Sequence, residues 1–224
     1  MEKINELEGD YKELVGQLSI GYEKFKERYS LAKAITTISF SIEIKSNIRK
    51  QCYSRLIKLC ELWFAFEKFL NLLDELGFIL DNTLSKPSLI SEETINSFDL
   101  HTIVKETSDE INLVFDTEQK KKKLKDFINH LHSKGDDRQK RLLNASVNKI
   151  DNIEHNSLKL QEVLSMIYAI RNLHVHDGDT FINAMKSFEL TRELLYILAI
   201  FIEKTVEKSW EKAIELNIEK IERE

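Results

Sequence analysis

One short segment of this 224-residue chain groups side chains that can act together on a phosphodiester: Arg171-Asn172-Leu173-His174-Val175-His176. Cleavage of RNA without a metal ion requires a proton carrier that works near neutral pH and a fixed cation that stabilises charge on the phosphorane. His176 and Arg171 supply one of each, and Asn172 lies one helical turn before His176, where its amide can orient the imidazole. The predicted catalytic residues are therefore Arg171, Asn172 and His176. His174 is an accessory candidate, for which a structural role is the stronger interpretation.

The spacing of this motif also constrains the assembly. On a continuous helix Arg171 and His176 lie about 140° apart around the axis, so a single chain forms an awkward site. Either the helix breaks before His176, or two protomers place their motifs across a two-fold interface. The non-catalytic alternative is that Arg171 and His176 only compensate the partial negative charge of a helix C-terminus.

The rest of the sequence predicts helices that position this segment. Only six glycines and one proline occur, too few for the turns of an all-β protein of this length. Apolar residues recur at intervals of three and four, as on the buried face of a helix. Asn156 is the expected N-cap of the helix that leads into the motif. Residues 2–28 are expected to form one helix, or two helices broken near Gly16 or Gly21. The other expected helices cover residues 30–50, 48–80, 99–115, 117–134, 137–153 and 181–222.

We therefore predict an all-α helical bundle that forms a single domain over residues 1–224. In this prediction residues 1–47 are an N-terminal helical extension, and residues 81–97, which contain several serines and the one proline, are a loop. The most apolar long segment, residues 48–80, is expected at the centre of the core. Its aromatic stripe is interpreted as core rather than as a base-stacking platform: Trp63, Phe64, Phe66 and Phe69.

Net charge, the length of the apolar runs and the cysteine spacing limit the compartment and the partners that we expect for this protein. The formal charge of −5 disfavours a non-specific nucleic-acid or membrane binder, although a site that faces a single phosphate stays open. The strongest apolar run, residues 194–202, is too short to cross a bilayer, so no membrane partner is expected. Cys52 and Cys60 fall in one predicted helix, too far apart along it for a disulfide. We expect free thiols in a reducing compartment, the cytoplasm.

Two further groups of residues have the composition of a ligand site. His130 and His132 have the spacing of metal ligands, but on a helix they point about 160° apart. We therefore expect no metal site and no cofactor. A basic run has the character of an RNA-backbone track, although a solvated helix face is the stronger interpretation: Lys120–Lys123, Lys125, Arg138, Lys140 and Arg141.

The motif resembles the signature of the HEPN superfamily, the nucleotide-binding helical bundles of higher eukaryotes and prokaryotes, many of which are metal-independent endoribonucleases. That signature is Arg, a polar residue that is often Asn, and then His, and Arg171, Asn172 and His176 match it position by position. The acidic residues Asp177 and Asp179 depart from the family pattern, since they would repel an incoming phosphate.

The resemblance extends over part of the chain. It covers the helix that leads into the motif, residues 157–170, and the closing helix, residues 181–210. It covers the aromatic segment of the core helix, residues 62–67, more loosely. Residues 1–50 and 81–155 match no part of the family.

The resemblance implies a HEPN-type bundle with additional N-terminal helices that acts as a homodimeric, metal-independent endoribonuclease. By family analogy such a protein is a toxin or defence effector with RNA as its substrate and an antitoxin as a partner. One alternative is a non-catalytic HEPN module that binds a nucleotide, RNA or a partner protein such as a nucleotidyltransferase-type antitoxin. Another is a helical scaffold without a ligand. The residues themselves leave these three functions open.

Overall fold

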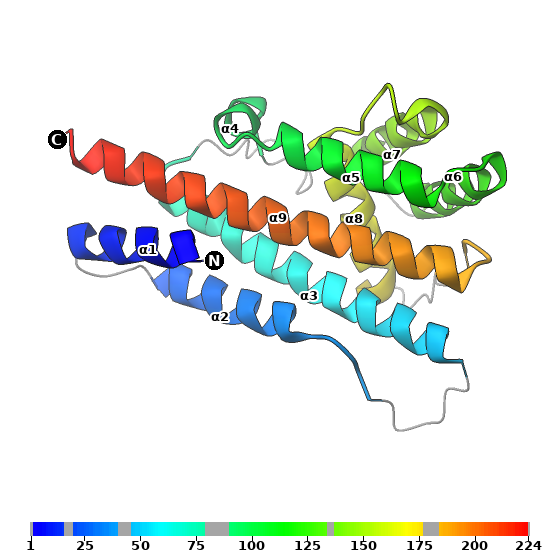
Figure 1. Ribbon diagram of the computed structural model, residues 1–224, viewed down its shortest axis with the longest axis horizontal. Helices are drawn as coiled ribbons and strands as arrows, with labels where there is room; N and C mark the ends of the chain where they lie inside the picture. The colour runs from blue at the N-terminus through cyan, green and yellow to red at the C-terminus, as the bar shows by residue number, and fades with distance from the viewer. Residues whose placement is uncertain are drawn as a thin grey trace.

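The structure is a computed structural model that describes residues 2–15, 20–39, 46–78, 90–133, 137–176 and 184–223, and for residues 2, 3, 92 and 176 the backbone alone. Within these ranges the chain forms nine α-helices, one short 3-10 turn and no strand (Figure 1). The predicted all-α helical bundle is therefore confirmed.

Two long helices, α3 (Asn47–Glu75) and α9 (Phe188–Ile221), run side by side through the middle of the bundle (Figure 1). Each begins at a serine whose hydroxyl accepts a backbone N–H of the first turn, Ser46 in α3 and Ser187 in α9. Their facing sides supply large side chains that are almost completely buried, among them Trp63, Phe66, Phe69, Phe201 and Trp210. This pair of helices is the centre of the core, as the apolar pattern predicts.

The N-terminal helices α1 (Glu2–Val15) and α2 (Ile20–Ala34) pack against α9 and α3 respectively. The Tyr22 ring lies 5.1 Å from that of Trp210, and the Phe25 ring lies 5.2 Å from that of Phe69. Both α2 aromatics are buried in the same core as the central helices. The N-terminal extension is thus an integral layer of the bundle.

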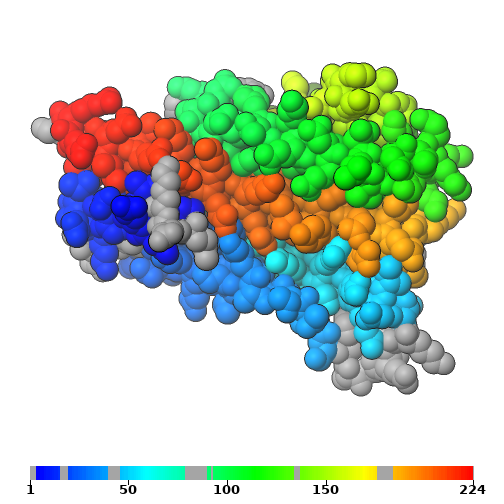
Figure 2. Space-filling view, viewed as in Figure 1, coloured from blue at the N-terminus to red at the C-terminus, as the bar shows by residue number. Residues whose placement is uncertain are grey.

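The other side of α9 is covered by α5 (His101–Val114), with α6 (Glu118–His132) and α7 (Asp137–Lys149) beyond it. Figure 2 shows α9 as a band between these helices and the N-terminal layer. After the 3-10 turn η2 (Ile150–Asn152), helix α8 (Leu160–His176) crosses behind α3 and α9 in the view of Figure 1. This crossing brings the C-terminal end of α8, with the motif, against α3.

The start of α8 differs from its prediction. The helix begins four residues after Asn156, and Glu162 supplies the cap by accepting the backbone N–H of Lys159 at 2.8 Å. The buried Glu162 carboxylate also accepts a hydrogen bond from Lys149 Nζ at 2.9 Å, which compensates its charge. Asn156 is therefore not the N-cap, because a carboxylate that reaches back from the first turn takes that role.

Three other predicted segments need correction. The closing helix expected over residues 181–222 is wrong for residues 184–187, because α9 begins at Phe188 with Ser187 as its N-cap. The loop expected over residues 81–97 is wrong for residues 92–97, which form the short helix α4 (Glu92–Ser97) with Ser91 as its N-cap. Residues 81–89 lie outside the described part. The helix expected over residues 30–50 is wrong for residues 35–39, which follow the end of α2 in a non-helical conformation. The run of β-branched residues there competes with helix formation.

Cys52 and Cys60 are buried free thiols, as predicted. Every helix formed by the described residues is too short or too polar to cross a membrane.

Candidate functional site

The motif lies on the last turns of α8, which continues without a break through His176. The alternative in which the helix breaks before His176 is therefore wrong. Arg171 and His176 take positions about 140° apart around one helix axis. The side chain of His176 and both acidic residues that follow it, Asp177 and Asp179, lie outside the described part.

Arg171 contacts Asn172 on its own helix and Phe64 on α3. Its Nη1 donates a hydrogen bond of 2.8 Å to the amide oxygen of Asn172. Its guanidinium carbon lies 4.8 Å from the centroid of the Phe64 ring on α3, within the range of a cation–π contact. Arg171, Asn172 and Phe64 are all half-buried. The amide and the ring together restrict the orientations that the guanidinium can adopt.

Phe64 contacts a second guanidinium, that of Arg28 on α2, whose central carbon is also 4.8 Å from the ring centroid. Arg28 Nη2 in turn donates to a carboxylate oxygen of Glu61 at 2.8 Å. The aromatic stripe of α3 is thus not uniformly core: Trp63 and Phe66 are fully buried, whereas Phe64 forms a half-buried platform between α2 and α8. The sequence contains no local signal for this contact between three helices.

His174 lies on the same turn of α8 as the motif and is half-buried. Burial disfavours the charged imidazolium and lowers the pKa of His174. The ring is consequently neutral at pH 7. Its neighbour Val175 leaves 44% of its surface exposed at the end of the helix, an apolar group next to the charged motif.

Cys60 is buried close to Arg171 and serves as packing. Burial raises the pKa of its thiol to about 12, although the positive charge of Arg171 acts in the opposite direction. Since the thiolate is the reactive form, Cys60 is not a nucleophile at neutral pH. The chemistry available at this end of α8 is that of the guanidinium, the amide and the imidazoles.

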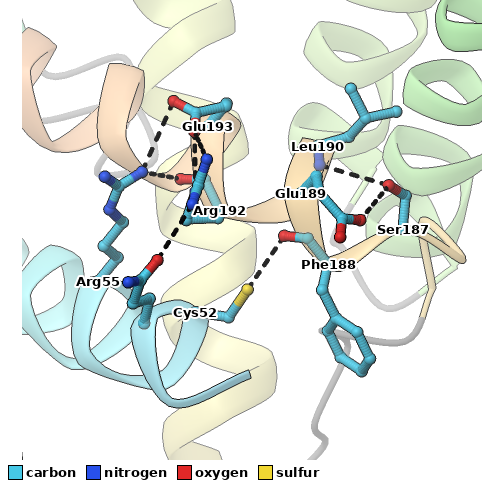
Figure 3. Close-up of polar contacts among 9 residues, drawn as sticks. Cys52, Arg55, Ser187, Phe188, Glu189, Leu190, Arg192 and Glu193 are labelled. Carbon is cyan, nitrogen blue, oxygen red and sulfur yellow. Dashed lines mark hydrogen bonds and ion pairs between the residues drawn. The ribbon is translucent and has the colours of Figure 1, made fainter. Parts of the chain in front are cut away.

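A second group of arginines connects the beginnings of α3 and α9 (Figure 3). The side chains involved are those of Gln51, Arg55, Arg192 and Glu193. Arg55 Nη1 donates to the backbone carbonyl of Arg192 at 2.8 Å and lies 3.7 Å from the Glu193 carboxylate. Arg192 donates to Glu193 through Nε at 2.8 Å and to Gln51 through Nη1 at 3.1 Å. These contacts join two helices and keep their charges compensated.

The basic run on α6 is largely engaged with its own surface. Lys120 forms an ion pair with Asp116 at 2.8 Å, Lys121 donates to the backbone carbonyl of Asp151 at 3.2 Å, and Lys125 pairs with the Asp151 carboxylate. These partners favour the solvated helix face over an RNA track. Among the side chains that the structure describes, no three His, Cys, Asp or Glu come together as ligands of one metal ion.

Comparison of the chain with protein-family models, with curated proteins and with solved structures gave no match. The geometry at the end of α8 is therefore the basis for assigning a function.

Proposed function

We propose that the protein is a metal-independent endoribonuclease of the HEPN type that works as a homodimer. The observation that carries this proposal is the placement of Arg171, which the Asn172 amide and the Phe64 ring hold at the end of the helix whose last residue is His176. A cation fixed before the substrate arrives stabilises developing charge without the cost of reorganisation. Its planar fork of N–H groups also matches the oxygens of a phosphate.

In the proposed reaction the 2′-hydroxyl of the RNA attacks the adjacent phosphorus. A base accepts the hydroxyl proton, a new P–O2′ bond forms, and the P–O5′ bond breaks. The leaving 5′-oxygen takes up a proton, so the products are a 2′,3′-cyclic phosphate and a 5′-hydroxyl. We assign the proton transfers to His176 and charge stabilisation on the phosphorane to Arg171. No step requires a metal ion.

The angular separation along α8 supports a dimer. Because the helix is continuous, Arg171 and His176 of one chain face directions about 140° apart. A two-fold axis near the end of α8 would bring Arg171 of one chain near His176 of the other. The exposed apolar side chain of Val175 lies between them in sequence and would be covered in such an interface. Light scattering should report a dimer at tens of micromolar, and a strict monomer there contradicts the composite site.

The enzyme assignment is tested by incubating the full-length protein with single-stranded RNA in the presence of EDTA. Cleavage should persist and should yield 2′,3′-cyclic phosphate ends, and His176→Ala should lower the rate by about 10²–10⁴-fold. His155→Ala is the matched control, since His155 is an exposed histidine in the turn before α8. Activity that needs added Mg²⁺ and leaves 5′-phosphates contradicts the proposal.

Two other outcomes select the alternative functions. RNA binding without any cleavage that depends on Arg171 and His176 assigns a non-catalytic HEPN module. Absence of both binding and cleavage leaves the helical scaffold. By family analogy we also propose that the substrate is cellular RNA, that the protein is a toxin or defence effector in the cytoplasm, and that an antitoxin is its partner. Co-expression with a gene next to its own tests that last point.

A further inference from the structure

An open cavity of about 480 Å³ lies at the other end of α8 from the motif, between α4, the start of α5 and the start of α8. Its floor includes the apolar side chains of Ile95, Val104 and Leu158, all of which are buried. His101 and Lys105 contribute to its wall from α5, and Lys159 does so from the residue before α8. The cavity therefore combines an apolar floor with a basic rim.

Among the described residues that line the cavity, the charged side chains are basic and none is acidic. Lys105 and Lys159 are exposed, and within the described ranges neither ammonium group has an ion pair. By contrast, Lys149 and Lys204 reach carboxylates at 2.9 and 2.8 Å. Two lysines thus converge on one cavity without a carboxylate among its described lining residues, which favours an anionic ligand.

The acidic side chain nearest to Lys159 in sequence is engaged elsewhere. Glu162 directs its carboxylate to the Lys159 backbone N–H and to Lys149 Nζ. His101 Nε2 donates to the side-chain oxygen of Asn96 at 2.7 Å, so Nδ1 of the neutral ring can only accept a hydrogen bond. The two lysines therefore supply the positive charge of the rim.

We propose that this cavity binds a phosphate monoester, with the phosphate at the basic rim and the organic group on the apolar floor. Two lysines match a dianion better than a singly charged carboxylate. The floor favours an ester over inorganic phosphate, because apolar surface is covered when the organic group binds. The ester can be a free small molecule or the terminal phosphate of an RNA. The site is independent of the proposed ribonuclease chemistry.

The first test is calorimetry of the full-length protein with phenyl phosphate. Binding should be detectable, and inorganic phosphate and phenol, which each satisfy only half of the cavity, should bind more weakly. Lys105→Gln and Lys159→Gln should each weaken phenyl phosphate binding by about tenfold, whereas Lys122→Gln, a change at an exposed lysine on α6, should not. Absence of phenyl phosphate binding at millimolar concentration, or equal affinity in all three variants, overturns the proposal.

A second measurement locates the ligand. The NMR signal of the His101 ring, assigned as the one missing from His101→Gln, should shift as phenyl phosphate is added, and an unmoved signal places the ligand elsewhere. Binding of RNA oligonucleotides to the His176→Ala variant then distinguishes the two possible ligands, a free small ester and the terminal phosphate of an RNA. Tighter binding of a 5′-phosphorylated strand than of the 5′-hydroxyl strand, lost in Lys159→Gln, assigns the RNA end. Equal binding of both strands assigns the small ester.

Discussion

Two arginines of this protein lie over aromatic rings in almost the same way but have different hydrogen-bond acceptors. The guanidinium carbon of Arg55 is 4.7 Å from the ring of Tyr196, and that of Arg171 is 4.8 Å from the ring of Phe64. Arg55 donates to a backbone carbonyl and approaches the Glu193 carboxylate, whereas Arg171 donates to the neutral amide of Asn172. The contacts of Arg55 join the beginnings of α3 and α9, whereas the Asn172 amide and the Phe64 ring fix the orientation of Arg171 at the end of α8.

The largest difference is expected in RNA cleavage. Arg171→Ala removes the fixed cation and should lower the cleavage rate by about 10²–10³-fold, as loss of one transition-state donor does. Arg55→Ala, measured under conditions where the variant is folded, should cleave at the wild-type rate. Initial rates on a single-stranded RNA in EDTA make this comparison. Equal losses in the two variants would show that both arginines act through the fold.

A smaller, opposite difference is expected in stability. Arg55→Ala removes a charged hydrogen bond to the Arg192 carbonyl together with the contact to Tyr196, so the free energy of unfolding should fall by about 2 kcal/mol. Arg171→Ala should change it by less than about 1 kcal/mol, because Arg171 lies at the end of α8 and its hydrogen bond to Asn172 stays within that helix. Urea denaturation followed by circular dichroism measures both. A greater loss in Arg171→Ala would make the motif arginine a structural group.

Some parts of this protein can be predicted from its sequence and others cannot, for a physical reason. The sequence predicts that α3 and α9 are long helices, because their apolar residues recur at helical spacing, but it does not identify the serine that begins each one. The motif is also visible, because it is local in sequence. The platform formed by Phe64 and Arg28 cannot be predicted from the sequence, because it depends on how α2, α3 and α8 are oriented relative to one another. Helical periodicity fixes which face is apolar but not which helix covers it.

The first residue of α8 also depends on a contact with another helix and therefore could not be predicted from local sequence. Asn156 is a good N-cap by residue type, yet α8 begins at Leu160, because Glu162 caps it and gains Lys149 from α7 as a counter-charge. That second partner is a tertiary contact. Local preference therefore predicts the helix and misses its first residue.

The next prediction concerns how stability depends on pH, and it distinguishes His174 from the proposed catalytic residue His176. Burial lowers the pKa of His174 below its ordinary value, so the unfolded chain binds a proton that the folded protein does not. This contribution to stability is present above about pH 6.5 and is lost as the pH falls toward the folded-state pKa. The unfolding midpoint should therefore decrease below pH 6.5, and His174→Gln should reduce that decrease. His174→Ala should also retain more cleavage activity than His176→Ala, and the reverse order would reassign the proton carrier.

The smallest effect is expected from the rings beneath the two arginines. Phe64→Leu keeps a half-buried apolar side chain but removes the π face, so Arg171 loses a contact worth about 0.5–1 kcal/mol and samples more orientations. Cleavage should fall about two- to fivefold. Tyr196→Leu is the matched control, because it removes the ring beneath Arg55 and should leave cleavage unchanged. If Phe64→Leu cleaves RNA at the wild-type rate while Arg171→Ala does not, the Asn172 amide alone positions the guanidinium, and the ring belongs only to the packing between α2, α3 and α8.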